Sequence, residues 1–264
     1  MMWGVKLRGL VLGIYNILIF IFLISPLVIV VLVSLNDTQY ISFPLKKLTL
    51  QWYKTIPEYM EFVDAFMVSI WLALLTAICS TTLGTMAAFA IVRGRFPGRD
   101  MISTLIMSPL TLPGVITGIA MLQFYTWISI GPSLGRLVLG HTVITIPYVV
   151  RSVSAVLYGF PLSLEEAGMN LGANRLRTTF LITFPLIRSG LLAGAIFSFI
   201  VSFDNVVISI FLVSPLYNTL PITIFNYVTY SAEPIIASIS TLQMLMIILL
   251  MVILEKVMGF SKYM

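Results

Sequence analysis

The 264-residue chain has one cysteine, one histidine and few charged residues. Charged side chains make up 9% of the chain, whereas a soluble domain has about 25%. So few charges cannot cover a water-exposed surface, which excludes a soluble globular protein. The single cysteine, Cys79, excludes an intrachain disulfide. With only one cysteine and one histidine we expect neither a metal site nor a Cys/His nucleophile.

The sequence also contains no Gly-Lys dipeptide. A phosphate-binding loop needs Gly-Lys followed by Ser or Thr to hold the phosphates of ATP. We therefore expect no catalytic residues and no cofactor in this chain.

Apolar residues, in contrast, make up 59% of the chain, and the mean hydropathy is +1.05. A run of about 20 apolar residues can cross a bilayer as a helix. The sequence therefore predicts an all-α integral membrane protein with about six transmembrane helices. No internal repeat or linker divides the chain, so residues 1–264 are expected to form one domain. The predicted spans are 10–35, 64–92, 101–127, 138–159, 186–213 and 235–257.

Lysine and arginine are unevenly distributed between the two sets of connecting segments. In one set, Lys46, Lys47, Lys54 and Arg136 are diluted by Asp37, Glu58, Glu61, Asp64 and Glu233. The other set, which includes both termini, holds Lys6, Arg8, Arg93, Arg95, Arg99, Arg175, Arg177, Arg188, Lys256 and Lys262. Because cytoplasmic loops carry the excess of positive charge, both termini are predicted to be cytoplasmic. The net charge of +5 reflects this topology and not a nucleic-acid-binding surface.

Two features concern the packing of the predicted spans. Small residues recur at three- and four-residue spacing in the second span, which predicts a face packed closely against another helix. They are Ser69, Ala73, Ala77, Ser80, Gly84 and Ala88. In the third span, Pro109, Pro113 and Gly118 predict an interrupted helix. Such breaks are tolerated where neighbours or a cavity satisfy the freed carbonyls, and they often border transport pathways.

The most specific pattern lies in the polar segment between the fourth and fifth spans. Ser163 is a helix-start residue, with Glu165 and Glu166 in the first turn. Gly172 suits the position just after a helix end, where a left-handed conformation turns the chain. A second short helix is expected from Ala173 to about Leu181, leading to Pro185 and the fifth span. The exposed face would present the carboxylates and Asn170 to a partner; the alternative is an ordinary amphipathic connector.

Within this segment, Glu166-Ala167-Gly168 is followed by Gly172, Ile182 and Pro185. This spacing resembles the loop E-A-A-x3-G-x9-I-x-L-P of permease subunits in bacterial ATP-binding-cassette importers. Gly168 replaces the second Ala of that pattern, and Phe184 replaces its Leu.

The resemblance implies a type I importer transmembrane domain with a cytoplasmic coupling helix. It also implies a homologous second permease subunit, two cytoplasmic ATPases that bind ATP and Mg, and an extracytoplasmic substrate-binding protein. Coupling to the ATPases would involve Glu165, Glu166, Ala167, Gly168, Asn170, Gly172, Ala173, Ile182 and Pro185.

A finer resemblance concerns the substrate. His141-Thr142 and the segment Ser202-Phe203-Asp204-Asn205-Val206-Val207 look like the second permease subunit of spermidine/putrescine importers. That subfamily implies import of a small, polyamine-like amine. However, Asn205 stands where such members usually carry a second acid, and Gly114 follows Pro113 where an acid is common. Opines, 4-aminobutyrate-like amino acids and aminophosphonates therefore remain open as substrates.

The same segment holds the candidate substrate pathway. Asp204 is the only acidic residue deep inside a predicted span, and such charges typically face a bundle interior or a water-filled cavity. Ser202 and Asn205 share its helix, while Tyr148 on the fourth span, Phe203 and Pro113 complete the candidate set. In the alternative interpretation, Asp204 pairs with a donor on a neighbouring helix. His141 is interpreted as an interfacial hydrogen-bonding residue at the outer boundary of the fourth span.

Two other classes of protein compete with the importer hypothesis. A secondary transporter or channel would have more ionisable groups within the membrane and would not need the polar loop. An intramembrane enzyme is disfavoured by the scarcity of His, Cys and paired carboxylates.

Overall fold

The computed structural model describes residues 2–38, 45, 47–231 and 233–258. Lys46 and Lys262, two of the charges used for the topology, lie outside the described residues. By its internal contacts the chain divides into two units, Met1–Met60 with Asn226–Met246, and Glu61–Phe225 with Ile247–Met264. We describe each unit by itself.

The first unit contains the long helix α1 (Met2–Ser34), the short helices α2 (Gln51–Thr55) and η1 (Ile56–Glu58), and the start of α12 (Ile235–Met258). Hydrogen bonds join these elements where α1 ends. Tyr53 Oη lies 2.6 Å from Ser34 Oγ, and Ser238 Oγ on α12 donates to Ser34 O over 3.2 Å. Trp52 Nε1 donates to Asn36 O over 2.8 Å. The polar end of α1 is therefore satisfied within its own unit.

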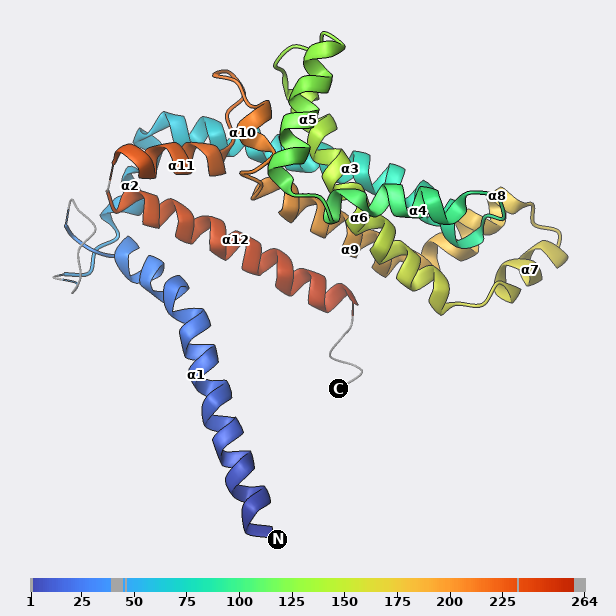
Figure 1. The fold of residues 1–264 in the computed structure, drawn as a ribbon, viewed down its shortest axis with the longest axis horizontal. Coiled ribbons are helices and arrows are strands. Elements are labelled where there is room, and N and C mark those ends of the chain that lie inside the picture. Colours follow the sequence, from blue (N-terminus) through green and yellow to red (C-terminus); the bar gives the residue numbers. More distant parts are fainter. Residues whose placement is uncertain (1, 39–44, 46, 232, 259–264) are drawn as a thin grey trace. The chain divides into compact units, whose positions relative to one another are not determined.

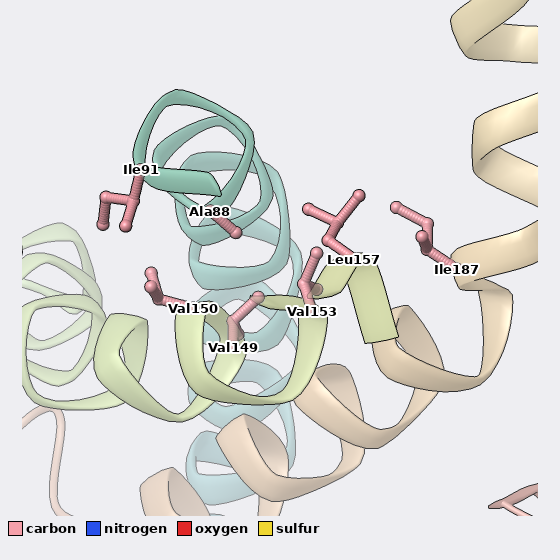
Figure 2. Packing of buried hydrophobic residues seen from close by; sticks show 7 residues of the cluster. All are labelled: Ala88, Ile91, Val149, Val150, Val153, Leu157 and Ile187. Carbon is pink, nitrogen blue, oxygen red and sulfur yellow. The ribbon is translucent and has the colours of Figure 1, made fainter. Parts of the chain in front are cut away.

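The second unit is built around α3 (Met60–Arg93), α6 (Leu134–Gly159) and α9 (Phe184–Phe203). Helices α6 and α9 lie side by side (Figure 1). Figure 2 shows the apolar core that α3, α6 and α9 share, which consists of Ala88, Ile91, Val149, Val150, Val153, Leu157 and Ile187.

Close approach of the helices in this core depends on small residues. Val149 on α6 lies so near Gly84 on α3 that a Cβ added there would be 2.7 Å from Val149 Cβ. A Cβ added to Gly194 on α9 would likewise lie 3.0 Å from Val149 Cα. The small-residue face predicted for the second span is confirmed, since Ser69, Ala73, Ala77, Ser80, Gly84 and Ala88 are all buried.

The predicted third span is not a straight helix. It consists of α4 (Arg99–Met107) with the turn η2 (Ser108–Leu110), followed by α5 (Gly114–Trp127), and the two halves are bent by 105°. Proline has no amide N–H and fixes φ, and Pro113 stands immediately before α5 with extended backbone. Each half has fewer residues than the about 20 that cross a bilayer. The predicted interruption is confirmed, and its angle is the new finding.

The predicted fifth span differs from the structure at both ends. Helix begins earlier, at α8 (Arg175–Thr178), and continues through the π-helical turn η3 (Thr179–Thr183) into α9. It ends at Phe203, and a separate short helix, α10 (Ser209–Leu212), follows the break. A further helix, α11 (Leu220–Tyr230), was not predicted, although Leu220-Pro221 at its start is a typical first turn.

The other spans agree with the sequence. Helices α1, α3, α6 and α12 cover the predicted spans 10–35, 64–92, 138–159 and 235–257 to within a few residues. Five helices in the described chain are long and apolar enough to cross a membrane, or six if the bent pair α4–α5 counts as one span. The prediction of about six transmembrane helices in an all-α protein is confirmed.

Candidate functional site

The polar segment after α6 forms the expected helix and turn. Helix α7 runs from Ser163 to Asn170, with Glu165 and Glu166 in its first turn. Gly172 has a φ of 91°, a left-handed conformation that favours glycine. Gly172 N donates to Met169 O and Ala173 N donates to Gly168 O, the paired bonds of a Schellman motif. The predicted helix end is therefore confirmed.

The second half of the segment was predicted incorrectly. In place of a separate helix from Ala173 to Leu181, α8 begins at Arg175, where the Asn174 side chain accepts from Arg177 N over 2.8 Å. Helix then continues past Pro185, because η3 is wound more loosely. Phe184 N donates to Thr179 O, five residues back. A π-helical turn leaves the carbonyls before a proline free to tilt away from its ring.

Two residues of the polar pattern lie against each other. Gly168 is buried, and a Cβ added to it would lie 2.5 Å from Ile182 Cδ1 on η3. The glycine that replaces alanine in the pattern thus gives room for the side chain of Ile182, fourteen residues further on. On the opposite side of α7, Glu166, Ala167 and Asn170 are exposed.

One of the two predicted carboxylates faces inward. Glu165 Oε1 lies 3.3 Å from Arg93 Nε at the end of α3, and the two side chains are only 17% and 16% exposed. The Arg93 guanidinium also donates to Phe160 O over 3.3 Å and stacks 4.8 Å from the centre of the Phe160 ring. Arg93 therefore anchors α7 to α3, a role that its sequence position did not predict. Glu166 is the carboxylate that remains on the exposed face.

The exposed surface near α7 is also more apolar than the polar pattern indicated. Leucines and other large apolar side chains are exposed on α7, its turn, α8 and η3, namely Leu164, Met169, Leu171, Leu176, Phe180 and Leu181. The side chain at the turn, Leu171, is 90% exposed. A surface with acidic, amide and apolar groups together has the composition of a protein–protein contact.

A cavity of about 240 Å³ forms where two helix breaks meet. One break lies between η2 and α5, and the other between α9 and α10. The cavity is lined by Pro109, Leu110, Leu112, Gly114, Thr117, Ile144, Tyr148, Val201, Asn205, Val207 and Ile208. Helices α5 and α10 lie next to each other beside it. Discontinuous membrane helices that expose their ends to a shared cavity are a common basis for substrate sites in transporters.

The cavity contains some of the predicted pathway residues but not others. Tyr148 and Asn205 line it, and Pro113 lies between the lining residues Leu112 and Gly114. Ser202 and Phe203 are buried without lining it. Asp204 follows the last residue of α9 and is exposed, so it lies in the break between α9 and α10 and not within the continuous helix that was predicted.

Hydrogen bonds within the turn explain why α9 ends there. Asn205 Oδ1 accepts from Ile208 N over 2.7 Å, and Ser209 Oγ donates to Asn205 O over 2.5 Å. Asn and Ser side chains compete in this way with the helical backbone bonds. The single helix that was predicted to carry Ser202 and Asn205 is consequently interrupted between them.

His141, predicted to be a hydrogen-bonding residue, is completely buried about two turns inside α6. Its Nδ1 lies 2.9 Å from Ser202 Oγ, and its Nε2 lies 3.2 Å from Ser209 Oγ. His141 is the single histidine of the sequence. Its contacts could not be predicted from neighbouring residues, because its two partners are 61 and 68 positions away.

The chain was compared with known protein families. A family described as the binding-protein-dependent transport system inner membrane component matches residues 80–260. The chain belongs to this family. The match includes the C-terminal part of α3 from residue 80, the α7 segment, both helix breaks and the whole of α12.

Individual members of the binding-protein-dependent family extend the similarity over most of the chain. The chain is 33% identical over 234 residues to the putrescine transport system permease protein PotI of Escherichia coli (strain K12), with 84% of this chain and 82% of PotI covered. It is 28% identical over 244 residues to the spermidine/putrescine transport system permease protein PotC of the same strain, with 92% of each chain covered.

Solved importers have the same fold at low sequence identity. The chain superposes with a TM-score of 0.72 on a bacterial ABC transporter that imports the acidic polysaccharide alginate, at 14% identity and covering 95% of this chain and 96% of that one. For the MetNI methionine ABC transporter in an inward-facing conformation the TM-score is 0.65 at 15% identity, covering 77% and 97%. These likenesses confirm the type I importer transmembrane fold.

Membership of the binding-protein-dependent family settles the class of protein. The chain is a multi-pass permease of an inner membrane and a component of a transport system, not an enzyme. The competing hypotheses of a self-sufficient secondary transporter and of an intramembrane enzyme are thereby excluded.

Proposed function

We propose that this permease subunit carries a small, polyamine-like organic amine across the bacterial cytoplasmic membrane by alternating access. The observation that supports the proposal best is the cavity at the meeting point of two broken helices. The chain that forms it is similar over most of its length to permeases named for putrescine and spermidine. Thr117, Tyr148 and Asn205 would provide polar contacts, and the apolar walls suit the methylene segments of such an amine.

Transport in this proposal is driven by ATP bound with Mg on separate subunits. Of two cytoplasmic ATPases, one would dock on α7. A second homologous permease would complete the membrane pathway, and an extracytoplasmic binding protein would deliver the substrate. The exposed Glu166 and Asn170, with the neighbouring apolar side chains, would contact the ATPase. Both termini would lie in the cytoplasm, on the same side as α7, because positive charge gathers there.

One observation favours a second candidate substrate, a zwitterionic amino acid of the 4-aminobutyrate or opine type. Within the part of the chain that the structure describes, no Asp or Glu lines the cavity. Asn205 already uses its Oδ1 to accept from Ile208 N, so its remaining amide group is a hydrogen-bond donor. A donor suits a substrate carboxylate, or the phosphonate of an aminophosphonate, better than it suits an ammonium group. For a polyamine, the second permease would have to provide the missing acids.

ATP-dependent uptake by the complete complex in proteoliposomes would test the substrate class. Radiolabelled putrescine and spermidine would be compared with 4-aminobutyrate, a zwitterion of similar length. We expect uptake of the polyamines, reduced by Asp204→Asn in an intact complex. Uptake of the zwitterion alone would replace the polyamine assignment, while unchanged uptake by the Asp204 variant would assign that side chain a structural role.

The docking of the ATPase on α7 is tested by Glu166→Lys. Reversing the charge of this exposed residue should leave the permease in the membrane but weaken copurification of the ATPase and abolish coupled uptake. Full uptake by this variant would refute the docking assignment. Asp100→Lys, which reverses an exposed carboxylate on α4, is the matched control and should retain the ATPase.

A further inference from the structure

His141 on α6 bridges the two sides of the break between α9 and α10. Ser202, to which its Nδ1 is joined, is the second-last residue of α9, and Ser209, which its Nε2 contacts, is the first residue of α10. All three side chains are buried, with exposures of 2% or less. A single imidazole therefore spans the interruption of the helix at the cavity wall.

The hydrogen bonds of this bridge have one consistent direction. The hydroxyl hydrogen of Ser209 is donated to Asn205 O, so Ser209 Oγ must accept from Nε2–H of His141. The other ring nitrogen of a neutral imidazole is an acceptor, so Ser202 Oγ–H donates to Nδ1. The network assigns the tautomer, and this assignment leaves each of the three side chains with a partner.

The bridge ends on the residues that form the cavity wall. Asn205, which accepts from Ser209, also accepts from Ile208 N, and both Asn205 and Ile208 line the cavity with Val207. The neighbouring residues of α6 hold the same segment. Arg136 Nη2 donates to Phe211 O over 3.3 Å, and Gly140 leaves room for the Leu212 side chain.

We propose that His141 is a positioning residue of the transport pathway, which fixes the turn between α9 and α10 through Ser202 and Ser209. The turn then holds Asn205, Val207 and Ile208 in one arrangement at the cavity. This inference rests on the proposed function in one respect, namely that the cavity belongs to the substrate route. His141 fixes the turn between α9 and α10 whichever substrate the permease carries.

Cysteine accessibility tests whether His141 holds the turn between α9 and α10 in place. The chain has a single cysteine, so Cys79→Ser gives a background in which Val207→Cys reports on the turn and Thr117→Cys reports on the opposite wall formed by α5. The rate of modification by a water-soluble thiol reagent would be measured in the complete reconstituted complex, with and without His141→Phe. Phenylalanine replaces the imidazole by another aromatic ring, which has no nitrogen atoms.

We expect His141→Phe to raise the modification rate at position 207 by about tenfold, the effect of losing two buried hydrogen bonds, and the rate at 117 by less than about twofold. Ser80→Ala is the matched control. It removes another buried bond of α6, the 2.5 Å contact between Ser80 Oγ and Thr145 Oγ1, and should leave both rates unchanged. Equal rates at position 207 with and without His141 would overturn the proposal. If His141→Phe does not assemble, Ser209→Ala breaks the same bridge with little change of volume.

Uptake kinetics test whether the cavity belongs to the substrate route, separately from whether His141 positions the turn. If the cavity is the substrate route, His141→Phe should raise KM about tenfold with little change in kcat, and should add nothing in an Asn205→Ala background. His141→Gln, which keeps a donor and an acceptor, should restore part of the affinity. A raised modification rate with an unchanged KM would support the positioning role and remove the cavity from the proposed route. A lower yield of complex with both quantities unchanged would make His141 structural only.

Discussion

Replacing Arg93 by glutamine should release α7 from α3. The arginine makes two hydrogen bonds of 3.3 Å, to the Glu165 carboxylate and to Phe160 O, and stacks on the Phe160 ring. Hydrogen bonds that involve charged groups contribute about 1.5–3 kcal/mol each. Because the bonds are long and the two side chains are about one-sixth exposed, we assign about 2 kcal/mol to the whole anchor. Loss of about 2 kcal/mol raises the population of the opened α7 about thirtyfold.

Hydrogen–deuterium exchange measures this opening directly. In the nucleotide-free complex in lipid nanodiscs, amides of residues 163–170 should exchange about thirtyfold faster in Arg93→Gln, since local opening controls their protection. Glu165→Gln should have a smaller effect, because Arg93 keeps its bond to Phe160. The double variant should exchange no faster than Arg93→Gln alone, as expected for residues of one anchor.

The matched control is the ion pair between Arg99 and Asp100. It has a similar separation of 3.4 Å, but its side chains are 43% and 95% exposed. Solvent-exposed pairs of this kind contribute little, so Arg99→Gln should leave the exchange of α7 unchanged. Two results would refute the role of Arg93 as an anchor of α7. One is an exchange rate of the α7 amides in Arg93→Gln within twofold of wild type. The other is strictly additive effects of the Arg93 and Glu165 substitutions on that rate.

Two further predictions concern glycines of the same segment. Gly172→Ala forces a side chain into a left-handed conformation and should destabilise the α7 turn by about 1–2 kcal/mol. Hydrogen–deuterium exchange of the α7 amides should therefore be faster in this variant. Gly159→Ala is the neutral control, because a Cβ added there meets open space. Gly168→Ala should be close to neutral, because a gain of about 1 kcal/mol in helix propensity is offset by displacement of Ile182 Cδ1. In an Ile182→Val background, which removes that methyl group, the same change should stabilise α7 by about 1 kcal/mol; equal effects in both backgrounds would contradict the contact.

Features set by neighbouring residues could be predicted from the sequence. The carboxylates in the first turn of α7 and the turn at Gly172 follow local rules for helix ends, and both are found in the structure. Helix α7 also begins at Ser163 as expected, although no side chain caps its first turn. The small residues of α3 were also predicted, because a repeat of three to four residues by itself defines one helix face.

Features that depend on distant residues could not be predicted in this way. The end of α9 depends on hydrogen bonds within the turn at Asn205 and on His141, more than 60 residues earlier. The pairing of Glu165 with Arg93 crosses 72 positions. For the third span, prolines marked the place of the break, but its bend depends on how α5 packs beside α6 and α10.

The continuity of α8, η3 and α9 has a mechanical consequence. Together they form one helix of 29 residues, about 43 Å long at 1.5 Å per residue. Gly168 of α7 lies against this helix at Ile182, and the turn at Asn205 follows its far end at Phe203. At 1.5 Å per residue the distance from Ile182 to Phe203 is about 31 Å, so a tilt of about 5° at Ile182 would displace the far end by about 3 Å. A rigid helix of this length would act as a lever, converting a small rotation beside α7 into a shift of the cavity wall of about 3 Å.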